Sequence, residues 1–511
     1  MSIQIDGSNL TIDQVVAVAR GGEKVEFAPE ARRRIESSAE LVGKLVDRNI
    51  AIYGVTTGIG EFARIRISAE MGAELQRRII YSHAAGVGEP FPEDVVRSAM
   101  LLRANTLARG NSGVRFQVPR ILVDMLNNGV TPVVCEKGSL GVSGDLSPMS
   151  QLSVVCLGEG EAFYNGERLP GGEALRRAGL KSVDLTYKEG LGFINGSQMC
   201  TGGAALQLAD ARNLIKNALV AAAMTIDALK GVQSAYDARL HAVRPFYGQN
   251  LVARHLRTLM EGSRIIAEKS GKVQDGYSMR CTPQVLGPTV DAWNYVARQV
   301  ETEMNSSADN PLFFTEDEAY LAGGNFHSQN IALAMDFLAM AMAEVADLSE
   351  RHTNRLMNPV LSGLPDFLVE GKGLNSGLMV AQYTAAALVS ENKVLAHPAV
   401  VDSISVSADQ EDHVAMTPIS VRKCGEILRN VTNVLAIEIM AAAQAFDFRR
   451  PLEPGRGTKP AYLKVREVVD HLENDRVLYP DIEKIARLVG SGEIVGAVEA
   501  EVGGLEIEQP R

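Results

Sequence analysis

Several features that define whole classes of protein are missing from this 511-residue sequence. It has no excess of positive charge: the formal net charge is −11, whereas a general nucleic-acid surface needs clustered Lys and Arg. No apolar run is as long as a membrane span, and the richest, residues 218–229, is interrupted by Asp227. The first residues lack the basic and apolar segments of a signal peptide. We therefore expect a cytoplasmic protein that contacts neither nucleic acid nor membrane.

Cysteine and histidine are also arranged without the spacing that metal sites use. The five cysteines are widely spaced and form no CxxC pair, and the eight histidines form no HExxH motif. Free thiols in a reducing compartment and the absence of a metal are the expected consequences.

The chain does contain long apolar segments with helical character. The predicted helices are residues 92–107, 204–229, 330–351 and 421–445. Several are apolar on most faces, which is typical of helices inside a bundle. Strand-like alternation is sparse, and the short candidates are residues 3–5, 130–134 and 162–164. The more charged tail after about Asp470 is expected to form a separate small helical piece.

A loop rich in glycine and serine, residues 138–148, reads Gly-Ser-Leu-Gly-Val-Ser-Gly-Asp-Leu-Ser-Pro. Within it, the amide nitrogen of Gly144 could attack the carbonyl of Val142 and close a five-membered ring, because glycine tolerates the strained backbone that closure needs. Loss of water from that ring and from Ser143 would leave 4-methylideneimidazol-5-one, a strong electrophile. Taken alone, such a loop is more often a simple turn. It carries neither glycine-rich phosphate-binding motif, so no nucleotide is expected.

The same loop resembles the prosthetic-group loop of the histidine and phenylalanine ammonia-lyases and related aminomutases. Further motifs of this family follow in the family's order along the chain. The matching segments are residues 52–60, 75–76, 82–88, 188–191, 195–198, 274–281, 305–306, 309–311, 324–327 and 410–413. Together they are too specific to arise by chance. The chain is therefore identified as a member of the family that builds a methylideneimidazolone group from its own backbone.

The resemblance implies catalytic roles for individual residues. Val142, Ser143 and Gly144 would form the electrophile, which captures the α-amino group and makes it a better leaving group. Tyr53 would be the base that removes the β-proton, with its phenol pKa lowered by fixed donors and helix dipoles. Arg280 would bind the substrate carboxylate with two parallel hydrogen bonds.

A second group of residues would hold the substrate and the ring in place. Asn195, Gln274 and Tyr277 resemble the family's polar set, which orients the substrate and helps to polarise the ring carbonyl. Phe326 is expected to pack near the ring.

His83 and Glu411 bear on the choice of substrate. Histidine- and tyrosine-acting relatives carry His at the place of His83, which could bond an imidazole or a phenol. Glu411 stands in Gln-Glu-Asp-His, as in histidine lyases, and a carboxylate can accept an imidazole N–H and favour its cation. L-histidine, giving urocanate and ammonia, is the favoured substrate. A buried ion pair is the alternative role for Glu411.

Two departures from the histidine branch leave other activities open. Val142 replaces the usual Ala, and its β-branched side chain is expected to crowd the loop. Gln329 stands where histidine lyases usually have Glu, as in tyrosine-acting enzymes and aminomutases. A 2,3-aminomutase acting on histidine or tyrosine is therefore the alternative. A third possibility, a helical oligomer without the ring, is disfavoured by the intact Ser143, Gly144 and Tyr53.

The resemblance also implies the architecture. The fold should be mainly α, with a long-helix bundle of the fumarase/aspartase-like type and a smaller N-terminal α+β domain that carries the ring-forming loop. We expect the N-terminal domain to comprise residues 1–200, and the bundle with the C-terminal helical region to comprise residues 201–511. Members of the family form homotetramers whose sites are assembled from more than one chain.

Overall fold

The computed structural model describes residues 2–268 and 270–510, and it is predominantly helical. The chain divides into two compact units, each assembled from three stretches of sequence. Unit 1 comprises Met1–Ala209, Ala297–Asp336 and Pro398–Arg422. Unit 2 comprises Asp210–Val296, Phe337–His397 and Lys423–Arg511. The expected division near residue 200 stays a prediction.

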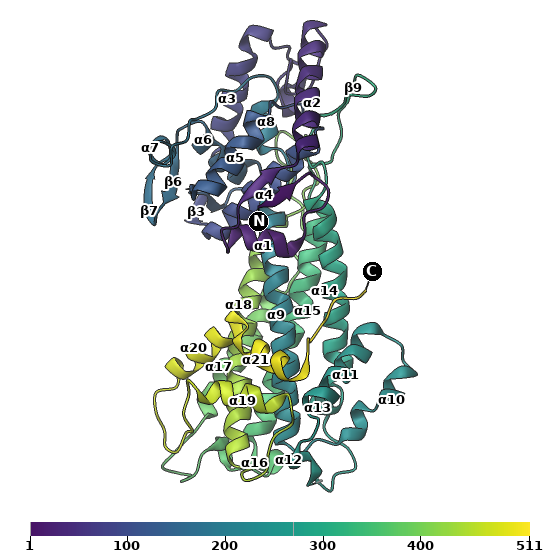
Figure 1. The fold of residues 1–511 in the computed structure, drawn as a ribbon, viewed down its shortest axis with the longest axis vertical. Coiled ribbons are helices and arrows are strands. Elements are labelled where there is room, and N and C mark those ends of the chain that lie inside the picture. Colours follow the sequence, from purple (N-terminus) through teal and green to yellow (C-terminus); the bar gives the residue numbers. More distant parts are fainter. Residues whose placement is uncertain (1, 269, 511) are drawn as a thin grey trace. The chain divides into compact units, whose positions relative to one another are not determined.

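Unit 1 combines short helices with small sheets (Figure 1). Its helices are α1 (Ile12–Ala19), α2 (Pro29–Asp47), α3 (Gly72–His83), α4 (Glu93–Ala108), α5 (Gln117–Asn128), α6 (Leu146–Cys156), α7 (Gly171–Arg177) and α8 (Glu189–Ile194). Its strands are β1 (Ile3–Ile5), β2 (Val25–Phe27), β3 (Val87–Pro90), β4 (Thr131–Pro132), β5 (Cys135–Lys137), β6 (Glu161–Tyr164), β7 (Glu167–Pro170), β8 (Leu312–Phe314) and β9 (Ala319–Leu321).

The strands of unit 1 pair in small groups. β1 pairs with β2 in parallel, and β4, β6 and β7 form an antiparallel sheet in that order. The antiparallel pairs β3–β5 and β8–β9 complete the set within the described residues. These small sheets, together with the helices, give unit 1 the α+β character that the sequence predicts for the domain carrying the ring-forming loop.

Helix α4 is the core of unit 1. It starts after Pro92 with Glu93 and Asp94, whose negative charges suit the positive end of the helix dipole. Every side chain from Ser98 to Ala108 is buried, because α4 packs against α1, α2 and α5. A helix buried on all sides is expected to be apolar throughout, yet this one carries Arg103.

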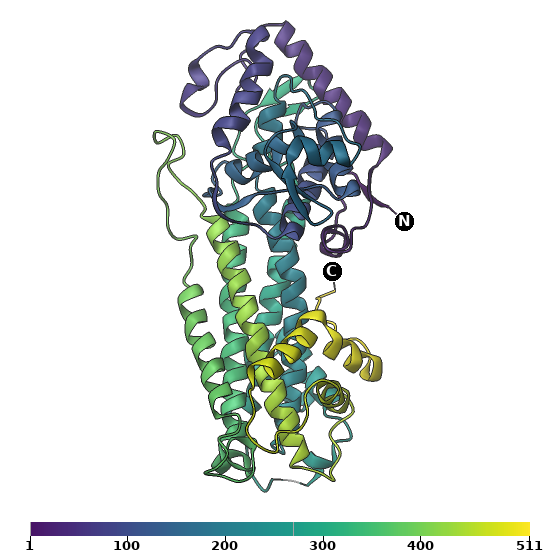
Figure 2. The same ribbon diagram turned by 90° about the vertical axis from the view of Figure 1, so that its left-hand side faces the viewer.

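Unit 2 is built around long helices. Four of the five boundaries between the units fall within α9 (Gln198–Ala228), α14 (Thr282–Met304), α15 (Gln329–Met357) and α18 (Thr417–Asp447), and the fifth lies between His397 and Pro398. The parts of these helices in unit 2 run side by side in both views (Figures 1 and 2). The other helices of unit 2 are α10 (Ala238–Ala242), α11 (Tyr247–Leu259), α12 (Arg264–Ala267), α13 (Tyr277–Arg280), α16 (Pro359–Ser362), α17 (Met379–Leu395), α19 (Thr458–Arg466), α20 (Tyr479–Ser491) and α21 (Glu493–Val502).

The predicted helices are confirmed with small shifts of their ends. Residues 92–107, 204–229, 330–351 and 421–445 correspond to α4, α9, α15 and α18, the last three being longer than predicted. The charged tail is helical, as expected, in α20 and α21. It is not separate, however, because α21 packs against α19.

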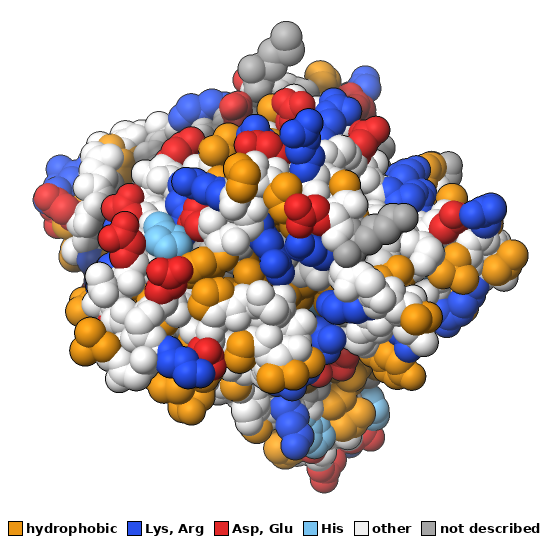
Figure 3. All heavy atoms as spheres, turned by 90° about the horizontal axis from the view of Figure 1, so that it is seen from below, with side chains coloured by type: hydrophobic (Ala, Val, Ile, Leu, Met, Phe, Trp, Pro, Cys, Tyr) orange, Lys and Arg blue, Asp and Glu red, His pale blue; other side chains and the backbone are white. Residues whose placement is uncertain are grey.

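The surface carries charges of both signs. On the face shown in Figure 3, Lys and Arg side chains are interspersed with Asp and Glu and with scattered hydrophobic groups. All five cysteines are free, and Cys156, Cys200 and Cys424 are buried. Among the described residues, no helix combines the length and apolar character needed to cross a membrane.

Candidate active site

The ring-forming loop connects β5 to α6 and is pressed against the segment that precedes α9. Gly144 has φ +75° and forms a parallel bridge with Gly196, and the Asp145 amide donates to the Gly196 carbonyl at 2.7 Å. A Cβ on Gly144 would collide with the backbone of Gly196. Both the left-handed φ and this close approach require glycine at position 144.

The opposite side of the loop is held by the segments before α15 and α18. The Ser328 hydroxyl donates to the Gly141 carbonyl at 2.6 Å, and the Met416 amide donates to the Leu140 carbonyl at 2.9 Å. Val142 is buried and packs with Val414 and Met416. The larger side chain therefore fills an apolar cluster. The apolar cluster thus has room for Val142, although a β-branched residue in place of the usual Ala was expected to crowd the loop.

Ser143 lies between a carboxylate and an amide. Its hydroxyl donates to Glu411 Oε1 at 2.7 Å, and Asn195 Nδ2 donates to its carbonyl at 3.1 Å. The Asn195 Oδ1 atom is buried with no hydrogen-bond partner in the described residues. The carbonyl of Ser143 would be the ring carbonyl of a methylideneimidazolone. An amide donor is thus already in place on the atom whose polarisation the prosthetic group requires, and these residues fit it.

Glu411 is carried by a long loop between α17 and α18 that has almost no regular structure (Figure 2). Reciprocal backbone hydrogen bonds join Val406 and Glu411 at 3.1 and 3.3 Å and close a tight turn. The turn fixes the half-buried Glu411 opposite Ser143.

Tyr53 stands in a loop that is fastened to α3 and α8. The buried Gln76 side chain donates to the Gly54 carbonyl at 2.8 Å and accepts from the Leu191 amide at 3.1 Å. The Gly60 amide donates to the Tyr53 hydroxyl at 2.9 Å. This arrangement gives the phenol a fixed orientation.

The expected depression of the Tyr53 pKa is wrong for this arrangement. Burial raises the pKa of Tyr53, and the nearby Glu411 carboxylate raises it further, while only the Gly60 hydrogen bond lowers it. Burial and a like charge both disfavour the phenolate, and a single amide donor does not outweigh them.

The remaining predicted residues of unit 1 make no hydrogen bond to this centre in the described chain. His83 ends α3, with its Nδ1 atom 2.7 Å from the Ile79 carbonyl and 3.0 Å from the Ser82 hydroxyl. Phe326 is half-buried just before α15. Gln329 is the first residue of α15, and its Oε1 atom is buried with no hydrogen-bond partner among the described residues.

The three predicted residues of unit 2 form a cluster of their own around α13. Arg280 Nη1 donates to the Gln274 side-chain oxygen, and the guanidinium stacks 4.6 Å from the centre of the Tyr277 ring. The Tyr277 side chain is 73% exposed, so its ring is open to a ligand or a neighbouring chain.

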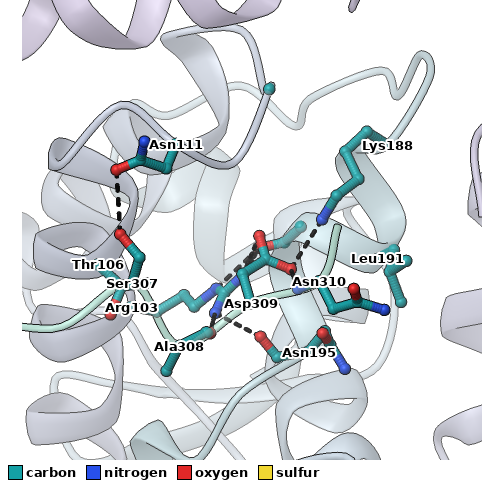
Figure 4. Close-up of polar contacts among 12 residues, drawn as sticks. Arg103, Thr106, Asn111, Lys188, Leu191, Asn195, Ser307, Ala308, Asp309 and Asn310 are labelled. Carbon is teal, nitrogen blue, oxygen red and sulfur yellow. Dashed lines mark hydrogen bonds and ion pairs between the residues drawn. The ribbon is translucent and has the colours of Figure 1, made fainter. Parts of the chain in front are cut away.

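Sequence reasoning gave no role to two buried charged residues, Asp145 within the loop and Arg103 in α4. Asp145 accepts hydrogen bonds from the Cys200 amide at 2.8 Å and from its thiol at 3.0 Å, and burial raises the pKa of Asp145. Arg103 donates to the carbonyl of Asn195 at 2.6 Å (Figure 4). No signal in the sequence singles out Arg103, because α4 also carries Arg97 and Asn105.

Comparison with known proteins shows the family to which the chain belongs. The model of the aromatic amino acid lyases matches residues 10–467. This chain belongs to the aromatic amino acid lyase family. A histidine ammonia-lyase of Alkaliphilus oremlandii is 51% identical, over 98% of this chain and 99% of its own length.

Solved structures of aromatic amino acid lyases and aminomutases share the fold. Histidine ammonia-lyase from Trypanosoma cruzi matches with a TM-score of 0.92 and 38% identity, over 100% of this chain and 99% of its own. Tyrosine aminomutase from Streptomyces globisporus matches with a TM-score of 0.94 and 37% identity, over 98% and 99%. The predicted family and mainly α fold are confirmed, and the chain is a carbon–nitrogen lyase whose substrate is an amino acid.

Proposed function

We propose that this chain eliminates ammonia from L-histidine to give urocanate. The observation that carries the proposal is the position of Glu411, whose carboxylate lies 2.7 Å from the Ser143 hydroxyl. An imidazole side chain can donate a hydrogen bond to such a carboxylate, and the carboxylate stabilises its protonated, cationic form. A phenyl ring has no donor, and a phenol has no cationic form for the carboxylate to stabilise. Several relatives about 50% identical over nearly their whole length carry the name histidine ammonia-lyase, which supports the same substrate.

The prosthetic group in this proposal forms from Val142, Ser143 and Gly144. When formed, it supplies an electrophile that makes the substrate amine a better leaving group. Asn195 holds the carbonyl of Ser143 through Nδ2. The N-termini of α6 and α9 follow the loop and the Asn195–Gly196 segment directly, so their partial positive charges favour negative charge on that carbonyl.

The other residues bind the substrate and move its proton. Tyr53 is the base for the β-proton, with its hydroxyl oriented by the Gly60 amide. Glu411 accepts the imidazole N–H. His83 uses Nδ1 for its backbone contact, which leaves Nε2 as the ring nitrogen that we assign to the substrate. Phe326 and Gln329 line the space beside the loop.

Gln274, Tyr277 and Arg280 bind and orient the substrate carboxylate in this proposal. The Arg280 guanidinium is held by Gln274 and by the Tyr277 ring, which presents a planar fork suited to a carboxylate. Since sites of this family are assembled from more than one chain, we propose a homotetramer. Exposed apolar side chains on α15 and α17, such as Phe337 and Tyr383, support such an association.

A 2,3-aminomutase is the second candidate, and Gln329 is the observation that favours it. Its Oε1 atom, buried and without a hydrogen-bond partner in the part of the chain that the structure describes, stands where histidine lyases usually carry a carboxylate. The two activities differ in whether the ammonia leaves or is returned to the β-carbon.

The test of the substrate is ammonia release from L-histidine, L-tyrosine and L-phenylalanine by the purified wild-type enzyme. The proposal expects a kcat/KM for histidine that exceeds the other two by a large factor. A preference for tyrosine would overturn the histidine assignment. A lack of ammonia from all three, with conversion to an isomer of unchanged mass, would replace it with the aminomutase.

A further inference from the structure

A fully buried cluster of three charged side chains, Arg103, Lys188 and Asp309, lies beside Asn195 (Figure 4). Lys188 Nζ lies 2.7 Å from Asp309 Oδ1, and Arg103 Nη2 lies 3.4 Å from Asp309 Oδ2. All three side chains have no exposed surface. Charges buried this deeply are expensive unless they are paired and hydrogen-bonded, so the chain must gain something from keeping them.

Arg103 donates hydrogen bonds to backbone carbonyls at the end of α8 and in the segment before Asp309. Nε donates to the Gly192 carbonyl at 2.7 Å, and Nη1 donates to the carbonyls of Asn195 at 2.6 Å and Ala308 at 3.1 Å. Nη1 also meets Gln198 Oε1 at 3.2 Å. One guanidinium therefore ties together the segments on both sides of Asn195.

The segment that Arg103 holds is the one against which the loop is pressed. Gly196 has φ +136°, and a Cβ there would lie 2.9 Å from Arg103 Nη1, so the guanidinium packs directly beneath Gly196. On its other side, Gly196 forms the bridge to Gly144 and accepts from the Asp145 amide at 2.7 Å. Arg103 therefore contacts Gly196, and Gly196 in turn contacts Gly144.

We propose that Arg103 is a positioning residue for formation of the prosthetic ring, holding Asn195–Gly196 as the rigid surface that presses Gly144 toward Val142. This inference rests on the proposed function. In the closure, the Gly144 nitrogen bonds to the Val142 carbonyl carbon, and that oxygen leaves as water with the hydrogens of the Gly144 and Ser143 nitrogens. The Ser143 hydroxyl and the hydrogen on the Ser143 Cα are then lost as a second water molecule, which leaves the methylidene group.

The predicted effect follows from the fork shape of the guanidinium. In Arg103→Lys the charge remains, but one ammonium cannot reach the carbonyls of Gly192, Asn195 and Ala308 together. Ring formation should slow on the order of 10-fold or more, as expected for loss of one or two buried hydrogen bonds from a charged donor. Purified Arg103→Lys protein should then be a mixture of chains with and without the ring.

Lys188→Met is the matched control. Lys188 belongs to the same buried cluster but contacts Asp309, with no hydrogen bond from its ammonium to Asn195 or Gly196 in the described residues. We expect Lys188→Met to form the ring to the wild-type extent. If it loses the ring as severely as Arg103→Lys, the cluster acts on the core as a whole and the inference is overturned.

The experiment is intact-chain mass together with near-ultraviolet absorbance of wild type, Arg103→Lys and Lys188→Met, each checked for folding by circular dichroism. A ring-bearing chain is lighter by two water molecules. Folded Arg103→Lys should gain the ring slowly on incubation, and its kcat should follow the ring-bearing fraction while KM stays unchanged. A complete ring in Arg103→Lys at the wild-type rate would overturn the inference.

Two further outcomes have defined meanings. If Arg103→Lys is insoluble, Arg103→Gln takes its place, because one amide group cannot donate to the carbonyls of Gly192, Asn195 and Ala308 together. A soluble Arg103→Gln protein with a complete ring then overturns the inference, and an incomplete ring supports it. If the wild type itself carries no ring, the proposed function fails and this inference with it, whereas a ring-bearing wild type isolates the role of Arg103.

Discussion

Replacement of Glu411 by Gln tests the substrate-binding role most sharply, because it changes the charge and keeps the shape. A hydrogen bond to a charged group contributes about 1.5–3 kcal/mol. Since about 1.4 kcal/mol corresponds to a factor of ten, kcat/KM for histidine should fall about 10- to 100-fold. Tyrosine or phenylalanine, where turned over at all, should not suffer this loss, because neither offers an imidazole to the carboxylate.

The same substitution has a second effect, on the pH profile. The Glu411 carboxylate raises the pKa of Tyr53, so its removal lowers that pKa. The phenolate is the form that accepts a proton, and turnover should therefore rise with pH through the alkaline range in the wild type. In Glu411→Gln this rise should move to lower pH, even as the rate for histidine decreases.

The assay is kcat/KM for the three amino acids, measured against pH, on wild type, Glu411→Gln and the control Asp412→Asn. Asp412 is the exposed neighbouring carboxylate, and its removal should leave the profile unchanged. Because Glu411 also binds the Ser143 hydroxyl, rates are expressed per ring-bearing chain, counted by intact mass. An equal loss for all substrates, or a profile that does not move, would refute the reasoning.

Three other substitutions test the remaining roles. Ser143→Ala should abolish turnover in a folded protein, because the methylidene carbon comes from this side chain. A near-normal kcat would show that turnover does not depend on the prosthetic ring. Tyr53→Phe should lower kcat by ~10²–10⁴-fold, as for loss of a general base, with a smaller change in KM; an effect on KM alone would show that Tyr53 is not the base. Arg280→Lys should mainly raise KM, because an ammonium cannot replace the guanidinium fork that binds a carboxylate; steady-state kinetics showing a loss confined to kcat would contradict this.

The fold was most predictable where one physical signal dominated. The apolar-rich stretches that became α4, α9, α15 and α18 are much longer than a typical strand, so their length indicates a helix. α14 and α17 lay outside the predicted helices. α14 has Pro288 near its start, which normally signals a helix end. α17 keeps large apolar side chains such as Tyr383 exposed, so its pattern is not that of a buried helix.

The site was predictable as a list of residues but not as an arrangement. Motif spacing nominated Ser143, Asn195 and Glu411, yet Glu411 lies 268 positions from Ser143 in the chain, and only the fold brings them to 2.7 Å. The pKa of Tyr53 was predicted with the wrong sign, because burial and the Glu411 charge depend on packing that no local pattern records. Arg103 donates to backbone carbonyls, and such contacts carry no side-chain signature in a sequence.

The product formed from L-histidine tests the central claim most directly. Wild-type enzyme is incubated with L-histidine, and the product is followed by ultraviolet absorbance and identified by mass. The account predicts a conjugated acid, lighter than histidine by one ammonia, accompanied by free ammonia in equal amount. A product of unchanged mass that carries the amine on the β-carbon, or no reaction by folded, ring-bearing enzyme, would contradict it.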